Sequence, residues 1–487
     1  MDASAVRRVR DAAREVVESH HLPGIAIGVV EGRELVFCEG FGLADIERGE
    51  AMEPTRRQRI ASITKTMVGL CVMALVDEGR ISLDDHVARL LPDVRWYGPG
   101  ASIRVRHLLM HTSGIGEAAT PGALAETVNP DREAVRQPGD FGTMFPDGIT
   151  VEAQPGSKWA YCNLGFALLG EIVVRAEGAP LHDVLQGRVF APLGMGDTEA
   201  LDEPHPTLTT GYHRAPTADA RELLERAGIA VRDEATVDGH NIRGSYRPEF
   251  NRAMVAAGGV QSTVPDMARY AAALLGGGGG IVRRETFEEM VAPQHCPDAR
   301  LESWGLAFAR TPRFGTLSIG HGGAYFGGWN SNLSVFRDHG FAVIQHMNVM
   351  LDRPAPVFSR ILRAVVGAPA PTAPAGVLDS GVAATAAGVY ECLPGRLTNF
   401  RPSLRIGRAQ IVARDGGLWL QARRGVWKQG VRLLPADPGD PFLFVVGSDD
   451  GEPDYVVLTR DRDGHVDGFR CDELVRMVRT EQVAGWV

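Results

Sequence analysis

The sequence predicts a mixed α/β fold, in which an antiparallel sheet is flanked by helices and followed by a small antiparallel β-barrel. Residues 5–366 alternate segments of helical and strand-like spacing. Residues 367–376 are rich in Pro, Ala and Gly, which is typical of a linker, and short alternating segments separated by turns follow them. We therefore expect one domain over 1–366, a linker over 367–380 and a β-barrel domain over 381–487.

A helix and a hairpin are expected at the start of the chain. Residues 5–20 repeat apolar side chains at helical spacing, and the run His-Leu-Pro-Gly that follows ends this pattern. The runs 25–30 and 34–42 are strand-like, and Gly32 lies between them. Their short separation predicts an antiparallel hairpin.

The remaining elements of the first domain follow from the same spacing rules. We expect helices over 63–78, 105–110, 164–176, 266–275 and 354–366, and strands over 316–320, 332–337 and 341–347. The helix over 164–176 is apolar on most of its circumference, which indicates burial. Residues 117–150 and 201–255 are polar and irregular. We expect insertions there, the second large enough to wall a pocket.

Charge and composition exclude several functions. The 487 residues include 51 basic and 60 acidic side chains, and the formal net charge of -9 argues against a nucleic-acid partner. No apolar run reaches about 18 residues, and the charged N-terminal segment lacks the apolar core of a signal peptide, so we expect no membrane partner and a cytoplasmic location. The 6 cysteines are widely spaced without a CxxC pair, which argues against a disulfide framework and a cysteine-rich zinc site.

Lysine is rare in this chain. Only Lys65, Lys158 and Lys428 occur among the 51 basic residues, and the others are arginines. Arginine cannot replace lysine where the chemistry needs an amine that loses its proton. Each remaining lysine is therefore a candidate for such a role.

The first candidate constellation is Ser62-Ile63-Thr64-Lys65 at the start of an expected helix. A lysine three residues after a serine returns to the same helical face, within reach of the hydroxyl. In a buried helix, desolvation disfavours the ammonium, and a neutral amine can accept the serine proton. Alone, the same spacing also fits a serine that caps the helix beside a solvated lysine.

A second candidate pair is Tyr161 and Asn163, just before the expected buried helix. Residues two apart on an extended segment point to the same side. The Tyr161 hydroxyl could relay protons while Asn163 positions an amide or the lysine. Alone, the tyrosine could equally be structural.

A third candidate site is the run His321-Gly322-Gly323, at the end of a strand-like segment. Small residues there let a substrate backbone lie against the strand edge. The next amide, of Ala324, could pair with the amide of Ser62 as an oxyanion hole.

Taken together, in this order, S-x-x-K, Y-x-N and H-G-G resemble the penicillin-recognising serine hydrolases, which include class C β-lactamases, D-Ala-D-Ala carboxypeptidases, D-aminopeptidases and esterases. The resemblance covers about residues 5–365. It extends to four longer segments: IASITKTMVGLCVMALVDEGRISLDDHVARLLPD, IRVRHLLMHTSGI, PGSKWAYCNLGFALLGEIV and GGVQSTVPDMARYAAALL.

This resemblance implies a fold and a set of roles. The fold is an antiparallel sheet with helices on its faces, opposite a mainly helical subdomain, with the active site between them. Ser62 would be the acylated nucleophile, Lys65 its base, and Tyr161 the group that activates water or another acceptor. The remaining roles fall to residues that line the site or hold the oxyanion: Asn163, His321, Gly323, Ala324 and the Ser62 amide.

The third motif departs from the β-lactamase pattern. Those enzymes usually have Lys-Thr/Ser-Gly, whose cation and hydroxyl hold the substrate carboxylate. Here His321 replaces the lysine and Gly322 has no hydroxyl. The resemblance therefore favours a hydrolase of esters or amides, including D-amino-acid peptides, over a β-lactamase or D-Ala-D-Ala carboxypeptidase. The C-terminal β-module resembles the lipocalin-like barrels attached to some members.

Two alternatives stay open. The acyl-enzyme could pass its acyl group to an amine or alcohol, as an acyltransferase or peptide cyclase does. A catalytically silent binding module is the other alternative. Three aromatic residues after the third motif, Tyr325, Phe326 and Trp329, could form a wall for the acyl group or pack in the core.

Neither a metal nor a cofactor is expected. His107 and His111 have the i, i+4 spacing of paired metal ligands, but no third ligand and no HExxH run accompany them, so we interpret them as structural histidines. The expected partner is a small-molecule or peptide acyl substrate, and a homo-oligomer is possible.

Overall fold

The computed structural model describes most of the chain. The described residues are 1–116, 148–200, 205–214, 242–243, 254–325, 327–351, 353–369, 376–392, 406–446, 454–471 and 476–480. The expected insertions over 117–150 and 201–255 fall largely outside these residues.

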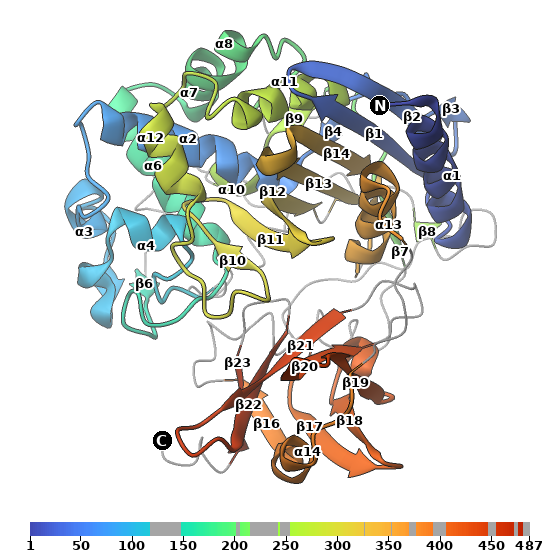
Figure 1. Cartoon of the computed structure of the whole chain (residues 1–487). Helices are drawn as coiled ribbons and strands as arrows, with labels where there is room; N and C mark the ends of the chain where they lie inside the picture. The colour runs from blue at the N-terminus through green and yellow to red at the C-terminus, as the bar shows by residue number, and fades with distance from the viewer. Residues whose placement is uncertain are drawn as a thin grey trace.

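An eight-stranded antiparallel sheet forms the centre of the larger part of the molecule (Figure 1). In spatial order its strands are β10 (Ser303–Trp304), β11 (Ala309–Arg313), β12 (Thr316–Tyr325), β13 (Trp329–Phe336), β14 (Phe341–Met347), β1 (Gly24–Glu31), β2 (Glu34–Asp45) and β3 (Glu50–Ala51). Short strands lie outside it: β4 (Gln58–Arg59), β5 (Trp96–Tyr97), β6 (Ile149–Thr150), β7 (Tyr212–Arg214), β8 (Ile242–Arg243), β9 (Gln261–Ser262) and β15 (Val349–Met350).

Helices cover both faces of this sheet. The helices of this part are α1 (Ala3–Ser19), α2 (Thr64–Asp77), α3 (Val87–Leu90), α4 (Val105–Leu109), α6 (Asn163–Glu177), α7 (Leu181–Leu185), α8 (Ala191–Leu193), α10 (Val255–Gly258), α11 (Val264–Leu275), α12 (Arg284–Val291) and α13 (Ala355–Val366). Within the described residues, none of the helices is both long and apolar enough to cross a membrane.

Strand β1 shows why the sheet needs helices on both sides. Its side chains alternate between the two faces, as pleating requires. Ile25, Ile27 and Val29 pack in a cluster with α1 and α13, whereas Ala26 and Val30 belong to the larger cluster that contains α2 and α11. A strand that is apolar on both faces is stable only between two layers.

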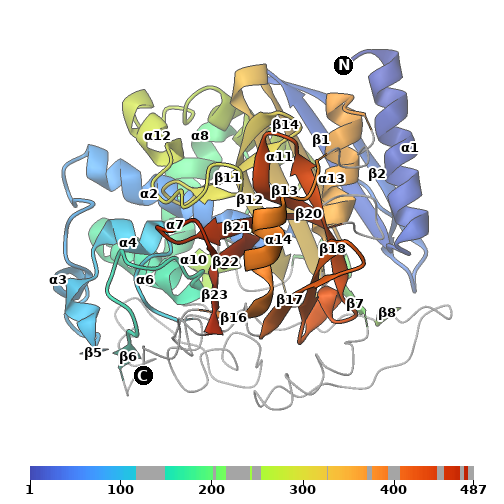
Figure 2. The same cartoon turned by 60° about the horizontal axis from the view of Figure 1, so that its bottom comes forward.

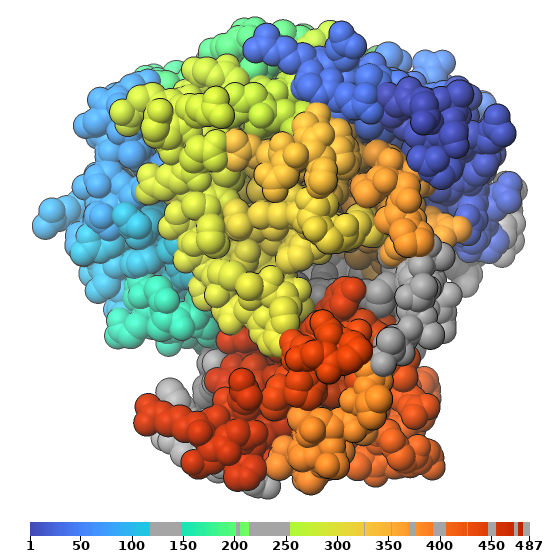
Figure 3. Space-filling model, viewed as in Figure 1, coloured from blue at the N-terminus to red at the C-terminus, as the bar shows by residue number. Residues whose placement is uncertain are grey.

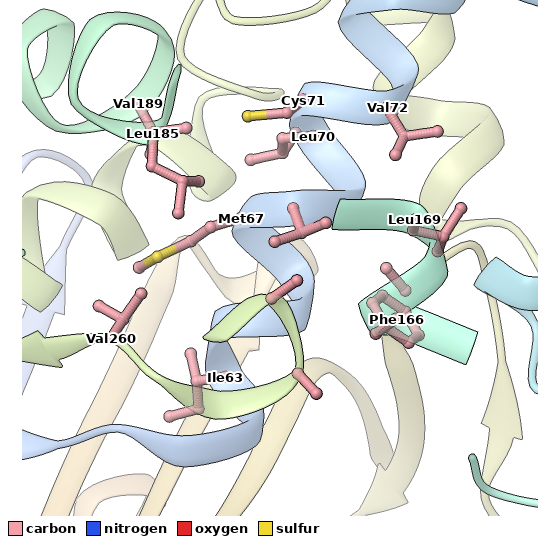
Figure 4. Close-up of a cluster of buried hydrophobic side chains, with 14 of the residues drawn as sticks. Ile63, Met67, Leu70, Cys71, Val72, Phe166, Leu169, Leu185, Val189 and Val260 are labelled. Atoms are coloured by element: carbon pink, nitrogen blue, oxygen red, sulfur yellow. The ribbon is translucent and has the colours of Figure 1, made fainter. Parts of the chain in front are cut away.

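The helical core is built around α2, whose residues are buried along almost its whole length. Met67, Leu70 and Cys71 of α2 lie on the side of Leu185 in α7 (Figure 4). On the other side, Val72 of α2 lies near Leu169 of α6. Close contact between helices depends on small residues, because a Cβ at Gly170 of α6 would lie 2.4 Å from the Cβ of Ala256 in α10. The expected burial of the helix over 164–176 is confirmed in α6.

The C-terminal part is a closed eight-stranded antiparallel barrel preceded by α14 (Ser380–Ala386) (Figure 2). Its strands, consecutive around the barrel, are β16 (Gly388–Cys392), β17 (Ala409–Arg414), β18 (Gly417–Ala422), β19 (Val431–Asp437), β20 (Asp440–Val446), β21 (Asp454–Arg460), β22 (Val466–Cys471) and β23 (Arg476–Arg479). Strand β23 pairs with β16 and so closes the barrel. Among the described residues, its hydrophobic core shares no member with the cores of residues 1–366.

The barrel lies against the end of the sheet where β10 and β11 are found (Figures 1 and 3). Arg300, just before β10, forms an ion pair with Asp440 of β20. Arg353, just before α13, forms another with Asp454 of β21. These ion pairs connect the barrel to the residues just before β10 and to those just before α13.

The predicted fold class is confirmed, since an antiparallel sheet with helices on its faces is followed by an antiparallel barrel. Individual bounds differ from the expectation. Strand β12 runs from Thr316 to Tyr325, so the run His321-Gly322-Gly323 lies inside the strand and not at its end. Helix α6 begins at Asn163, so the asparagine is the first helical residue and not part of an extended segment.

Separate cores predict separate unfolding. Phe469 is fully buried in the barrel and packs edge-to-face on Tyr390. Phe287 is equally buried in the larger part and packs edge-to-face on Phe308. Phe469→Ala should destabilise the barrel by about 3–5 kcal/mol through the cavity that it leaves. Calorimetry should show one transition moving, and Phe287→Ala should move the other. A single transition shifted equally by both changes would contradict separate cores.

Candidate active site

Ser62 lies in a short 3-10 turn (Ala61–Ile63) that leads directly into α2. Ala61 has a φ of 49°, a left-handed conformation that costs a non-glycine residue about 1–3 kcal/mol and is found mainly at functional sites. The backbone before the turn is fixed from two sides. The Ile60 amide donates to the Val260 carbonyl (3.1 Å), and the Ile60 carbonyl accepts from the Ser331 hydroxyl (2.7 Å). This strained turn therefore holds Ser62 at one position.

The Lys65 amine reaches the serine as the S-x-x-K spacing predicts. Its Nζ lies 3.0 Å from Ser62 Oγ, 2.8 Å from Asn163 Oδ1 and 2.5 Å from the Ala257 carbonyl oxygen. The side chain is fully buried. A buried amine is stable only when its protons have acceptors, and here two acceptors besides Ser62 supply this need. When Lys65 is neutral, its lone pair can receive the serine proton.

Tyr161 also lies close to the Lys65 amine. The centroid of its ring is 5.1 Å from Lys65 Nζ, and the ring of Phe166 is 5.6 Å away. The first and second motifs therefore meet around one amine, although Asn163 lies 98 positions after Lys65 in the sequence.

His321 reaches this group from β12. Its ring centroid is 6.1 Å from that of Tyr161, and its Nδ1 lies 2.5 Å from the Gly322 carbonyl oxygen. A carbonyl only accepts, so Nδ1 is the protonated nitrogen in this contact. Unlike a lysine, this side chain carries no permanent charge. His321 therefore brings the third motif next to the first two, without contributing a permanent positive charge.

Gly323 allows β12 to approach the nucleophile turn closely. A Cβ at this position would lie 2.4 Å from the Ile60 carbonyl oxygen and 2.1 Å from Ser331 Oγ. Ala324, the next residue, is exposed and pairs with Asn330 of β13. This arrangement brings the strand beside the turn that carries Ser62. The pairing of the Ser62 and Ala324 amides as an oxyanion hole stays a prediction.

Two of the three aromatic residues that follow the third motif lie in the hydrophobic core of the larger part. Tyr325 and Trp329 are buried in the main hydrophobic core. The Arg59 guanidinium carbon lies 5.1 Å from the centroid of the Tyr325 ring. Trp329 donates its indole N–H to Thr209 Oγ1 (2.9 Å). Phe326 lies outside the described residues. Their role as a wall for the acyl group stays a prediction.

Sequence reasoning missed an aromatic cluster that surrounds Tyr161. The cluster consists of His111, Trp159, Tyr161, Trp304 and His321. His111 stacks on Tyr161 at 4.2 Å, and Trp304 of β10 packs edge-on against both His111 (4.9 Å) and His321 (5.3 Å). Nothing in the spacing of Trp304 points to the site. Trp159 and His111 lie in segments that the family resemblance covered, and that was the only available signal.

The two histidines of the i, i+4 pair have separate contacts. His107 Nδ1 accepts from the Arg104 amide at the start of α4 (3.1 Å), and His111 Nδ1 accepts from the Cys162 amide (3.1 Å). Across the described part of the chain, no cluster of three or more His, Cys, Asp or Glu side chains is arranged to hold a metal ion.

The barrel lies near the loop that carries Tyr161. Lys158, three residues before Tyr161, interacts electrostatically with the Cys392 thiol of β16. Burial lowers the pKa of Lys158 to about 8 and raises that of Cys392 to about 11. The active-site loop therefore has a neighbour in the C-terminal part.

The close approach at Gly323 gives a direct test. Gly323→Ala should push β12 away from the turn that carries Ser62. A displacement of about 1 Å at an active site can lower the rate by about 10²-fold. Modification of Ser62 by a serine-reactive phosphonate should therefore slow to that extent. Gly187→Ala is the control, since a Cβ there meets nothing within 4 Å. Equal labelling rates in the two variants would contradict the proposed geometry.

The chain is similar in sequence to several known proteins. Esterase EstB from Burkholderia gladioli is 31% identical over 250 residues, which cover 48% of this chain and 63% of EstB. The alignment thus spans less than two thirds of that relative. A D-aminopeptidase from Gluconobacter oxydans is 25% identical over 489 residues, covering 96% of this chain and 82% of the relative.

Solved structures share the fold. The octameric penicillin-binding protein homologue from Pyrococcus abyssi superimposes with a TM-score of 0.63 at 20% identity, over 98% of this chain and 100% of that one. D-amino acid amidase from Ochrobactrum anthropi SV3 gives 0.61 at 23% identity, over 75% of this chain and 100% of that one. Residues 9–366 match the family model described as beta-lactamase, and the chain therefore belongs to the β-lactamase family.

Proposed function

We propose that the protein is a serine hydrolase that cleaves esters or amides, including amides and peptides of D-amino acids, through an acyl-enzyme on Ser62. One observation carries the proposal: the fully buried Lys65 amine lies 3.0 Å from Ser62 Oγ and donates a second hydrogen bond to Asn163 Oδ1 at 2.8 Å. This is the arrangement in which a neutral amine removes the serine proton.

The reaction follows from these contacts. Ser62 Oγ attacks the substrate carbonyl carbon while Lys65 Nζ takes the hydroxyl proton, and the amides of Ser62 and Ala324 stabilise the oxyanion. The tetrahedral intermediate collapses, and the departing alcohol or amine takes a proton from the Lys65–Tyr161 pair. The same pair then removes a proton from water as the water attacks the acyl-enzyme carbonyl. The second tetrahedral intermediate releases the carboxylic acid as the bond to Ser62 Oγ breaks, and the pair returns the proton to that oxygen.

The substrate class follows from the third motif. His321 offers no permanent cation to a substrate carboxylate, so neutral esters and amides should be preferred to substrates that depend on such a contact. The esterase and the D-aminopeptidase among the relatives support this choice, and the D-aminopeptidase alignment also includes the barrel.

Assembly and location belong to the proposal as well. The octameric homologue matches 98% of the chain at the level of fold, which supports a homo-oligomer for this protein too. The cytoplasmic location expected from the sequence stays a prediction.

The nucleophile can be tested by intact mass spectrometry. Mixed with a p-nitrophenyl ester, the protein should gain one acyl group on the peptide that contains Ser62, and turnover should fall by about 10³-fold or more in Ser62→Ala. If a broad serine-reactive phosphonate also leaves the parent protein unmodified, the hydrolase proposal is wrong.

The same assay distinguishes substrate classes. D- and L-amino-acid p-nitroanilides and a chromogenic cephalosporin, which bears a carboxylate, are compared with the ester by kcat/KM. Cleavage of the ester and the D-anilide above the cephalosporin fits the proposal. If an added amine diverts the acyl group at the expense of hydrolysis, the protein is an acyltransferase of the same fold instead.

The role of Lys65 can be tested against the other lysines. Lys65→Arg keeps a positive charge but cannot lose its proton, so kcat should fall by about 10³-fold or more. The control is Lys428→Arg, at an exposed position of the barrel, which should retain parental kcat. Retained activity in the Lys65 variant would show that the amine is not the base.

A further inference from the structure

His111 is held in an unusual conformation directly after α4. Its φ is 58°, in the left-handed region that a non-glycine residue rarely adopts, and only 1% of its surface is exposed. Its amide donates to the Leu108 carbonyl (3.2 Å). Backbone strain of this kind persists only where surrounding contacts enforce it, and it is concentrated at functional sites.

Three contacts of His111 involve the segment 160–162, which contains Tyr161. The His111 carbonyl accepts from the Ala160 amide (2.8 Å), and its Nδ1 accepts from the Cys162 amide (3.1 Å). Between these two bonds, the imidazole stacks on the Tyr161 ring at 4.2 Å and 29°. One residue therefore contacts three consecutive residues, 160–162.

These contacts extend to the reacting groups. Cys162 is the residue before α6, so fixing its amide also fixes the start of the helix, where Asn163 binds Lys65. The imidazole itself is enclosed by Trp304 edge-on (4.9 Å) and by Phe166 (5.2 Å). Because Nδ1 accepts a bond, that nitrogen carries no proton, and a neutral ring has its proton on Nε2.

We propose that His111 is a positioning residue for the reaction, which sets the Tyr161 ring and the start of α6 against Lys65. This inference rests on the proposed function, because it assigns His111 to the proton path of that acyl-enzyme reaction. His111 touches no substrate in this scheme. Its effect passes through Tyr161, the group that activates the acceptor, so its loss should slow deacylation most.

Two variants separate its contacts. His111→Asn tolerates the left-handed backbone and can offer an oxygen to the Cys162 amide, but it loses the stacked ring. His111→Phe keeps a ring and removes the acceptor. We expect kcat to fall by roughly 10²-fold for Phe and by roughly three- to tenfold for Asn, with KM changed by less than about threefold.

The decisive readout is the acyl-enzyme. Intact mass spectra during ester turnover should show a larger acylated fraction in both variants than in the parent, because the acceptor step is slowed. A structural defect would instead lower the number of active molecules without raising that fraction. The matched control is His107→Asn, in the helix just before His111, which should keep kcat within about twofold.

Each outcome has one meaning. A folded His111→Asn variant with the parental kcat and acylated fraction overturns the inference, whether or not His111→Phe folds. Slower turnover with more acyl-enzyme supports it. If the parent forms no adduct on Ser62, the proposed function fails first, and this inference fails with it. A labelled parent with unaffected His111 variants overturns this inference alone.

Discussion

Burial of the Lys65 amine is the constraint on which the rest of the site depends. An amine inside a protein is costly unless each of its protons has an acceptor. The acceptors here come from the 3-10 turn before α2, the start of α6 and α10. These three helices must therefore meet at one point. Gly170 allows it, because a Cβ there would collide with Ala256, the neighbour of the carbonyl that accepts from Lys65.

The predictable part of the site is the part encoded at short range. Ser62 and Lys65 are three residues apart, so helical geometry alone brings them together. Tyr161 and Asn163 could be recognised only as a pair with matching spacing, and their contact with Lys65 depends on how α6 packs on α2. The fold class was predictable for the same reason, since the periods of helices and strands are local properties of the sequence.

The remainder depends on contacts between distant segments. Trp304 comes from β10, an edge strand of two residues with no motif around it, and it reaches the site only because β10 pairs with β11 beside β12. His111 has an equally weak local signal, because its spacing from His107 resembled a metal pair while its real contact lies 51 residues away. Tyr325 and Trp329 show the opposite case: they lie close to a motif in the sequence, and yet they are buried in the hydrophobic core.

The barrel lies near a loop of the active site, which places the C-terminal part next to the reacting groups. Lys158 interacts with Cys392 of the barrel, and three residues later the same loop carries Tyr161. The ion pair of Arg300 with Asp440 holds the barrel close to β10, which carries Trp304. The barrel therefore lies near two segments that supply rings to the aromatic cluster, the loop of Tyr161 and strand β10, whereas Ser62 and Lys65 belong to the 3-10 turn before α2 and to α2 itself.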